Sequence, residues 1–185
     1  MNTVVLFGSA RQSGATRALL DLFLHELPPG EVTELDCYRL SIAPCWDCRH
    51  CWKRRACSIQ DDMQSVYRAI DRADCVVFAS PMYFSGVPGP MKCMIDRLQM
   101  YWAGRLRFDF PAEKTKKGVL LFTGGAPSFG SQFAAAEIML KAVLINLCAE
   151  HVGTVTVADT DHFPPQDQPE VAERCKELAA KVAGG

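Results

Sequence analysis

Four of the nine cysteines in this 185-residue chain lie within thirteen residues, with the spacing C-x2-C-x2-C-x5-C. Packing alone gives no reason to concentrate thiols in a stretch flanked by a proline and by basic residues. Closely spaced thiolates are ligands of soft metal centres, and a run at this short pitch sets three sulfurs around one iron–sulfur cluster. The spacing therefore predicts a [4Fe–4S] cluster whose ligands are Cys45, Cys48, Cys51 and Cys57.

Two other interpretations of this cysteine run stay open. The thiols could bind zinc or form a regulatory disulfide, although structural zinc sites more often pair two C-x2-C knuckles across a longer gap. They could also be free cysteines in a loop that holds no metal. The remaining cysteines fall on or near predicted strands and helices, and we interpret them as packing residues: Cys37, Cys75, Cys93, Cys148 and Cys175.

A second candidate site is the loop of residues 8–16, which follows a short apolar strand and opens directly into a helix. Backbone N–H groups at a helix N-terminus bind anions. Several donors that converge on one point suit a terminal monophosphate, whereas the G-x-G-x-x-G and G-x4-G-K-[ST] patterns are absent. An ordinary capped turn is the alternative. The residues predicted to hold the phosphate are Ser9, Arg11, Ser13, Gly14 and Thr16.

Two further loops combine flat side chains with glycine. One follows the predicted strand 75–79, and the other follows the predicted strand 118–123. Aromatic or soft side chains pack well on a planar ring, and glycines let the backbone approach it closely. We therefore expect contacts with a planar ligand from Pro81, Met82, Tyr83, Phe84, Ser85, Gly86, Thr123, Gly124 and Gly125.

Strand and helix patterns alternate along the whole chain. Short apolar runs indicate strands at 3–7, 32–35, 75–79, 118–123 and 152–157, and helical spacing follows each of them. Such alternation predicts a parallel sheet with helices on both faces and right-handed crossovers. We expect a flavodoxin-like three-layer α/β sandwich with strand order 2-1-3-4-5, in which a ligand binds at the C-terminal strand ends.

The predicted organisation is a single flavodoxin-like, ligand-binding domain over residues 1–185, with a cysteine-rich loop inserted at about 43–60. Residues 100–117 form an unusually long helix-to-strand connection that contains four aromatic residues among basic ones. We interpret this connection as a lid over the ligand or as a subunit contact.

Composition limits the partners that we expect. Twenty Lys and Arg against 21 Asp and Glu give a net charge of −1, which favours neither nucleic acid nor a membrane surface. We find no signal-peptide pattern and no apolar run near the roughly 18 residues needed to span a bilayer. Grouped thiols then fit a reducing, cytoplasmic setting.

Together these motifs resemble the NADPH-dependent FMN reductase-like branch of the flavodoxin superfamily, and within it the iron–sulfur flavoproteins. The matching segments are Gly8-Ser9-x-Arg11-x-x-Gly14-x-Thr16, the cysteine run with Ile59-x-Asp61-Asp62-Met63, Ser80-Pro81-Met82-Tyr83-Phe84, and Lys92 with Asp96-Arg97. The resemblance implies FMN, with its phosphate on the first loop and its isoalloxazine on the other two. It also implies a homodimer or homotetramer. Ala15 departs from the family, which often has Asn there, so one phosphate contact is missing.

By this resemblance the chain is an FMN-dependent oxidoreductase that passes electrons from ferredoxin or NAD(P)H to a small acceptor. FMN carries the chemistry, so no side chain is assigned as a catalyst. Basic residues near the cysteines would raise the potential of a cluster and dock an acidic carrier: Arg49, Lys53, Arg54 and Arg55. The alternatives are a cluster-free NAD(P)H-dependent quinone, azo or free-FMN reductase, a flavodoxin-like electron carrier, and a zinc- or thiol-based sensor.

Overall fold

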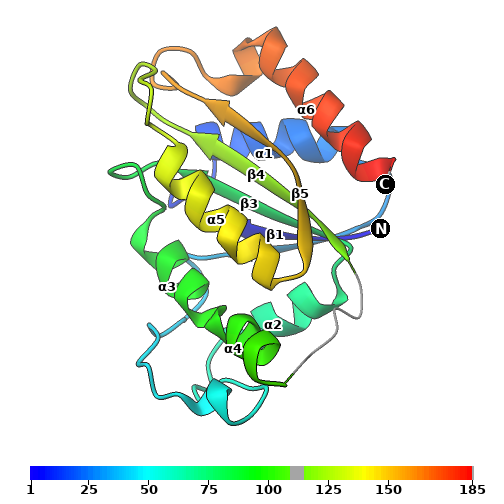
Figure 1. The fold of residues 1–185 in the computed structure, drawn as a ribbon. Helices are drawn as coiled ribbons and strands as arrows, with labels where there is room; N and C mark the ends of the chain where they lie inside the picture. The colour runs from blue at the N-terminus through cyan, green and yellow to red at the C-terminus, as the bar shows by residue number, and fades with distance from the viewer. Residues whose placement is uncertain (109–114, 185) are drawn as a thin grey trace.

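The computed structural model describes residues 1–108 and 115–184 (Figure 1). Its parallel strands form one sheet in the order β2-β1-β3-β4-β5, which confirms the predicted topology. The strands are β1 (Asn2–Phe7), β2 (Glu31–Asp36), β3 (Cys75–Pro81), β4 (Lys116–Thr123) and β5 (Ala149–Val157). The α-helices are α1 (Ala15–Glu26), α2 (Met63–Arg72), α3 (Gly89–Arg97), α4 (Gln99–Phe108), α5 (Ala134–Asn146) and α6 (Pro169–Ala183).

The central strands are apolar because they are buried on both faces. Successive side chains of a strand point to opposite faces. Val5 and Phe7 of β1 therefore join a core with α1 and α6, whereas Val4 and Leu6 join a second core with α2, α3 and α5. Figure 1 shows the resulting three layers, with α1 and α6 on one side of the sheet and α5 on the other.

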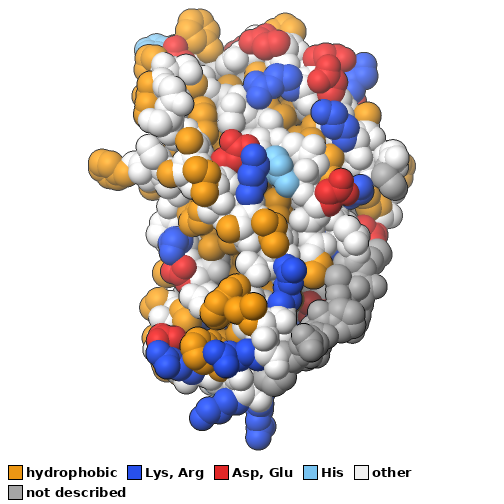
Figure 2. Space-filling model, viewed as in Figure 1, with side chains coloured by type: hydrophobic (Ala, Val, Ile, Leu, Met, Phe, Trp, Pro, Cys, Tyr) orange, Lys and Arg blue, Asp and Glu red, His pale blue; other side chains and the backbone are white. Residues whose placement is uncertain are grey.

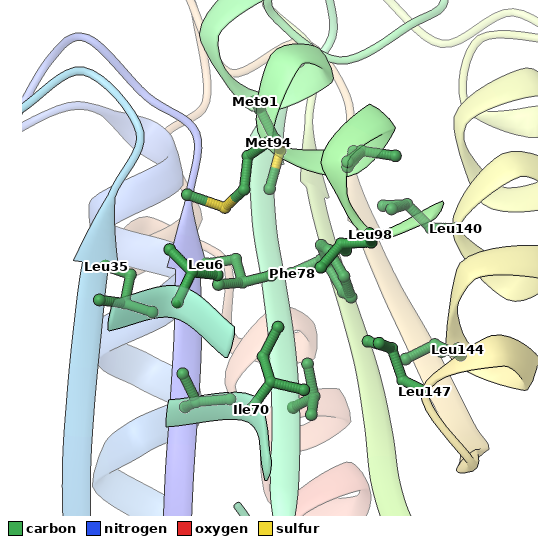
Figure 3. Close-up of a cluster of buried hydrophobic side chains, with 14 of the residues drawn as sticks. Leu6, Leu35, Ile70, Phe78, Met91, Met94, Leu98, Leu140, Leu144 and Leu147 are labelled. Atoms are coloured by element: carbon green, nitrogen blue, oxygen red, sulfur yellow. The ribbon is translucent and has the colours of Figure 1, made fainter. Parts of the chain in front are cut away.

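The second core fixes the helices that carry the cysteine segment and the ligand-binding loops. In Figure 3, Leu6 and Phe78 of the sheet lie among side chains from α2, α3 and α5. Met94 of α3 and Ile70 of α2 are completely buried in this cluster. The positions of α2 and α3 relative to the sheet are therefore set by packing, which also fixes the ends of the loops that connect them to it.

Helix α4 differs from the sequence-based expectation. The first half of the predicted long connection, residues 100–108, is helical, and α4 begins directly after Leu98, the C-cap residue of α3. The helix has no amphipathic period. Its large apolar residues Trp102 and Leu106 are exposed, whereas the small Ala103 is buried. Phe110, one of the aromatic residues in the predicted lid, lies outside the described residues. The two short 3-10 helices are η1 (His50–Trp52) and η2 (Pro165–Asp167).

The described residues include no helix that is both long enough and apolar enough to cross a membrane.

Candidate functional site

The three loops predicted to bind a ligand meet at the C-terminal edge of the sheet. The N–H of Gly8 donates to the carbonyl of Ala79 at 2.8 Å, which joins the ends of β1 and β3. The N–H of Met82 donates to the carbonyl of Thr123, also at 2.8 Å. The hydroxyls of Thr16 and Thr123 lie 2.7 Å apart and are both buried. One hydrogen-bonded unit therefore connects the first turn of α1 with the ends of β3 and β4.

The N-terminus of α1 is open to an anion. Gly14 is its N-cap residue, no described side chain caps the helix, and its first turn contains no acidic residue. The Ser9 hydroxyl lies 3.2 Å from both the N–H and the carbonyl oxygen of Arg11, so it shapes the loop. Arg11 and Ser13 are exposed. The uncapped N–H groups and the helix dipole thus give the N-terminus of α1 a positive electrostatic potential that no acidic residue of the first turn offsets.

The loop after β3 folds into a strained hairpin turn. Tyr83 and Gly86 exchange both backbone hydrogen bonds, at 2.8 and 3.1 Å. Phe84 and Ser85 between them have φ angles of 51° and 59°, the positive values that a type I′ turn needs. A bulky residue such as Phe84 rarely adopts such angles, and its side chain is fully exposed. Strain of this kind is concentrated at binding sites, so Phe84 is a candidate ligand contact.

Two glycines after β4 lie close to side chains of the chain itself. A Cβ atom on Gly124 would lie 2.4 Å from Nε2 of Gln132, and one on Gly125 would lie 2.6 Å from Oδ2 of Asp161. The neighbouring atoms are the ends of side chains, so a Cβ at either position would require Gln132 or Asp161 to shift. Gln132 itself is buried, and its Oε1 has no hydrogen-bond partner in the described structure, so an acceptor is left over beside Gly124.

The segment after β5 is a part of this edge that sequence reasoning missed. The N–H of Asp159 donates to the carbonyl of Ala126 at 2.8 Å, and that of Thr160 donates to Gly124 at 3.0 Å. The Asp159 carboxylate lies 2.6 Å from Nδ1 of His162 and raises the pKa of that exposed imidazole through this hydrogen bond. The run of polar residues directly after a buried strand is the signal that could have identified the segment.

The cysteine segment, residues 43–60, follows β2, and Arg97 binds residues near both of its ends. The guanidinium of Arg97 donates to both carboxylate oxygens of Asp61, at 2.9 and 3.1 Å. It also donates to the carbonyls of Ala43 at 2.9 Å and Ile59 at 3.3 Å. Asp61 in turn accepts a hydrogen bond from the N–H of Ala43 at 2.9 Å. Both ends of the segment are thus tied to the last turn of α3.

The middle of the cysteine segment rests on α4. The ring of Trp52 lies between the guanidinium groups of Arg107, 3.8 Å from its centroid, and Arg49, at 4.9 Å. Trp102 of α4 packs at 6.3 Å from the same ring. Cation–π contacts of this kind hold a loop in place without an apolar core. Helix α4, which lies in the connection interpreted above as a lid or a subunit contact, therefore packs against the cysteine segment.

The four predicted cluster ligands line one small cavity of about 30 Å³, together with Arg97. Cys45 and Cys48 are exposed, and Cys51 and Cys57 are half-buried. The Ser58 hydroxyl, 3.1 Å from Sγ of Cys48, lowers the pKa of that thiol. All nine cysteines are free, and the described residues contain no group of three His, Cys, Asp or Glu placed to hold a metal ion.

The other cysteines match the packing interpretation in part. Cys37, Cys75 and Cys175 are buried, which confirms their predicted place in the core. Burial raises the pKa of Cys37 and of Cys75 to about 12, so these thiols stay neutral. Cys93 and Cys148 are half-buried.

A doubly wound sheet of order 2-1-3-4-5 with ligand-binding loops at its C-terminal edge defines a flavodoxin-like α/β protein. Residues 1–163 match the model of the NADPH-dependent FMN reductase family, and the chain belongs to that family.

Relatives and solved structures agree with this assignment. An iron-sulfur flavoprotein of Archaeoglobus fulgidus is 31% identical over 103 residues, which cover 56% of this chain and 51% of the relative, so the chain spans about half of its length. An iron-sulfur flavoprotein of Methanocaldococcus jannaschii is 30% identical over 75% of this chain and 69% of its own.

Among solved structures, the NAD(P)H:quinone oxidoreductase of Methanothermobacter marburgensis has a TM-score of 0.78, with 19% identity and coverage of 98% of this chain and 96% of its own. An FMN-dependent NADH-azoreductase of Bacillus anthracis, in complex with FMN, has a TM-score of 0.67, with 12% identity over 99% of this chain and all of the other. At these identities the likeness concerns the fold.

Proposed function

We propose that this chain is an FMN-dependent oxidoreductase that binds FMN at the C-terminal edge of its sheet. The observation that carries the proposal is the uncapped N-terminus of α1, which lies at the point where the strand order reverses and is linked through Thr16 to the end of β4. An anion at this position meets free N–H groups and the positive end of the helix dipole. The family match and the FMN named in the azoreductase structure support FMN as the ligand.

In this proposal each loop keeps the role that the sequence assigned to it. When bound, FMN supplies the hydride and electron transfer. The chain binds the phosphate, orients the ring and shields it from water. The phosphate would lie against Ser9, Arg11, Ser13, Gly14 and Thr16. The ring would lie against Pro81, Met82, Tyr83, Phe84, Ser85, Gly86, Thr123, Gly124 and Gly125.

We also propose that the cysteine segment binds a [4Fe–4S] cluster. The chemistry of the donors fits such a group, because four thiols line one cavity together with Arg97, whose Nε–H is buried and has no partner among the described residues. A metal site is rarely preformed before the metal binds, so the thiols have to draw together on binding. Cys45, Cys48, Cys51 and Cys57 would be the ligands, in a cytoplasmic setting that keeps thiols reduced.

The electron donor that we propose is NAD(P)H or ferredoxin, and the acceptor is a small molecule. The relatives named iron-sulfur flavoprotein support an oxidoreductase with a cluster as the first candidate. The quinone oxidoreductase and azoreductase structures support a cluster-free reductase as the second candidate. Figure 2 shows Lys and Arg side chains at the end of the molecule where Figure 1 places the cysteine segment. The exposed Lys53 and Arg54 lie there and suit an acidic carrier such as ferredoxin.

The proposal is tested on protein purified without oxygen, by measuring flavin content and the bleaching of flavin absorbance by NADPH, NADH and reduced ferredoxin. We expect one FMN per chain, reduced by at least one of these donors and reoxidised by a small quinone. Turnover with NADPH and quinone without iron favours the cluster-free reductase. A flavin that none of the donors reduces would contradict the proposed activity.

We further propose that a second copy of this chain covers the outer face of α5, as a homodimer or within a homotetramer. Ile138, Ala142 and Ile145 follow helical spacing and are exposed, the two isoleucines by 71% and 62%. Figure 2 shows hydrophobic side chains over this helix. An exposed group of large apolar side chains of this kind often marks an interaction surface. A second copy, and not an unrelated protein, would supply the matching face by twofold symmetry.

Replacing Ile138 with glutamate is expected to dissociate the oligomer, because an unpaired charge would be buried in its interface. Sedimentation velocity measures the change. Val32→Glu is the matched control, since Val32 is also exposed but lies on the edge strand β2. A monomeric parent chain, or an Ile138→Glu variant of unchanged mass, would contradict the proposed interface.

A further inference from the structure

Arg97 is the largest completely buried side chain that the structure describes, and one of its donors is unused. A guanidinium has five N–H donors. The Nη1 and Nη2 atoms make four hydrogen bonds, to Ala43, Ile59 and twice to Asp61. Nε is buried and has no partner among the described residues. A buried N–H without an acceptor is costly, and native structures rarely keep one without a reason.

The surroundings of Arg97 indicate which acceptor is missing. Arg97 lines the same cavity as Cys45, Cys48, Cys51 and Cys57. Carbonyls and carboxylates in reach are already bonded to the other two nitrogens. The four cysteines are among the other residues that line this cavity, and Arg97 lies close enough to Cys57 for the two groups to interact electrostatically. Sulfur atoms of thiolates and of iron–sulfur clusters accept N–H hydrogen bonds, and such bonds raise the reduction potential of a cluster.

A neighbouring tyrosine holds Arg97 in this position. The hydroxyl of Tyr67 donates to the carbonyl of Arg97 at 2.9 Å, and it lies beside the Cys57 thiol. The ion pair with Asp61 fixes the other side of the guanidinium. These contacts fix the side chain, and none of the hydrogen bonds described for it uses Nε.

We infer that Arg97 is a positioning residue for the cluster: its Nε–H donates a hydrogen bond to a sulfur atom of the cysteine site, which stabilises the reduced cluster. This inference rests on the proposed cluster. It assigns Arg97 a function beyond closing the base of the segment. A merely structural Arg97 would leave the potential of a correctly loaded cluster unchanged.

The test is a redox titration of the cluster by EPR in protein reconstituted with iron and sulfide. Arg97→Lys keeps the positive charge but lacks Nε–H, and we expect the equilibrium constant for one-electron reduction to fall about tenfold, a shift of ~59 mV to lower potential. Asp61→Asn is the matched control, because it weakens the same ion pair but keeps Nε–H. Removal of its negative charge moves the potential in the opposite direction or not at all.

A second measurement needs no variant. In parent protein labelled with ¹⁵N-arginine, pulsed EPR of the reduced cluster is expected to show a ¹⁵N coupling from an arginine bonded to sulfur. Iron bound without that coupling, or with an unchanged potential in Arg97→Lys, overturns the inference and leaves the cluster standing. A chain that binds no iron overturns both the cluster and the inference.

Discussion

Replacing Asp61 with alanine is expected to lower the free energy of unfolding by about 3–5 kcal/mol, because it leaves a buried guanidinium without its counter-charge. The Arg97 side chain is 1% exposed and Asp61 is 14% exposed, so solvent offers little compensation. The change would also release the N–H of Ala43. Urea denaturation followed by circular dichroism measures the loss.

Asp62→Ala is the control for this prediction, because the next residue is also acidic but is exposed. Its carboxylate accepts one hydrogen bond, from the N–H of Ser41 at 2.7 Å. Loss of one exposed hydrogen bond of this kind costs about 1 kcal/mol. If Asp61→Ala and Asp62→Ala destabilise the protein equally, the ion pair with Arg97 does not hold the cysteine segment to α3.

The same ion pair predicts an acid-sensitive contribution to stability. Burial by itself raises the pKa of Asp61, but hydrogen bonds from Arg97 and from two backbone N–H groups outweigh it, so the pKa lies below its usual value. A carboxylate with a depressed folded-state pKa stabilises the fold above its unfolded-state pKa of about 4, and the contribution is lost as the pH falls through the folded-state value. Asp61→Ala should therefore flatten the decline in stability at acid pH.

Serine at any one of the four cysteines that line the cavity is expected to reduce bound iron from about four atoms per chain to less than about one. In the proposed cluster each cysteine would supply one thiolate, and a hydroxyl is a poor ligand for iron–sulfur centres. Iron and sulfide analysis of protein reconstituted without oxygen measures the change. Flavin content should stay unchanged, because the loops proposed to bind FMN are separate from the cysteine segment.

The chain contains its own controls for this experiment. Cys37, Cys75 and Cys175 are buried in the two cores and lie outside the cavity. Alanine at these positions should cost stability through lost packing but leave iron bound. Iron that survives serine at Cys45, Cys48, Cys51 and Cys57 would contradict the cluster. Zinc in place of iron would favour the sensor alternative.

The sheet could be predicted because its causes are local. The apolar runs of β1 and β3 have strand length, and the alternation with helical spacing leaves few topologies for five parallel strands. The ends of β1, β3 and β4 then had to meet at one edge, and the hydrogen bonds of Thr123 to Thr16 and Met82 show that they do.

The rest of the site depends on contacts between distant residues. Arg97 at the end of α3 looks like an ordinary cation at a helix C-terminus, and only the tertiary structure places it against Asp61, 36 residues away. Helix α4 has no apolar period, so its sequence gives no helical signal. Gly124 and Gly125 lie against Gln132 and Asp161, which no local pattern connects to them.

The claim on which this account depends is that the open N-terminus of α1 binds the phosphate of a flavin mononucleotide. It is tested most directly by titrating apoprotein with FMN and with riboflavin, which differ only in that phosphate, and following quenching of flavin fluorescence. We expect one FMN per chain and riboflavin binding at least about 100-fold weaker, or roughly 2.7 kcal/mol. Equal affinity for the two flavins, or no saturable binding of FMN, would contradict the account.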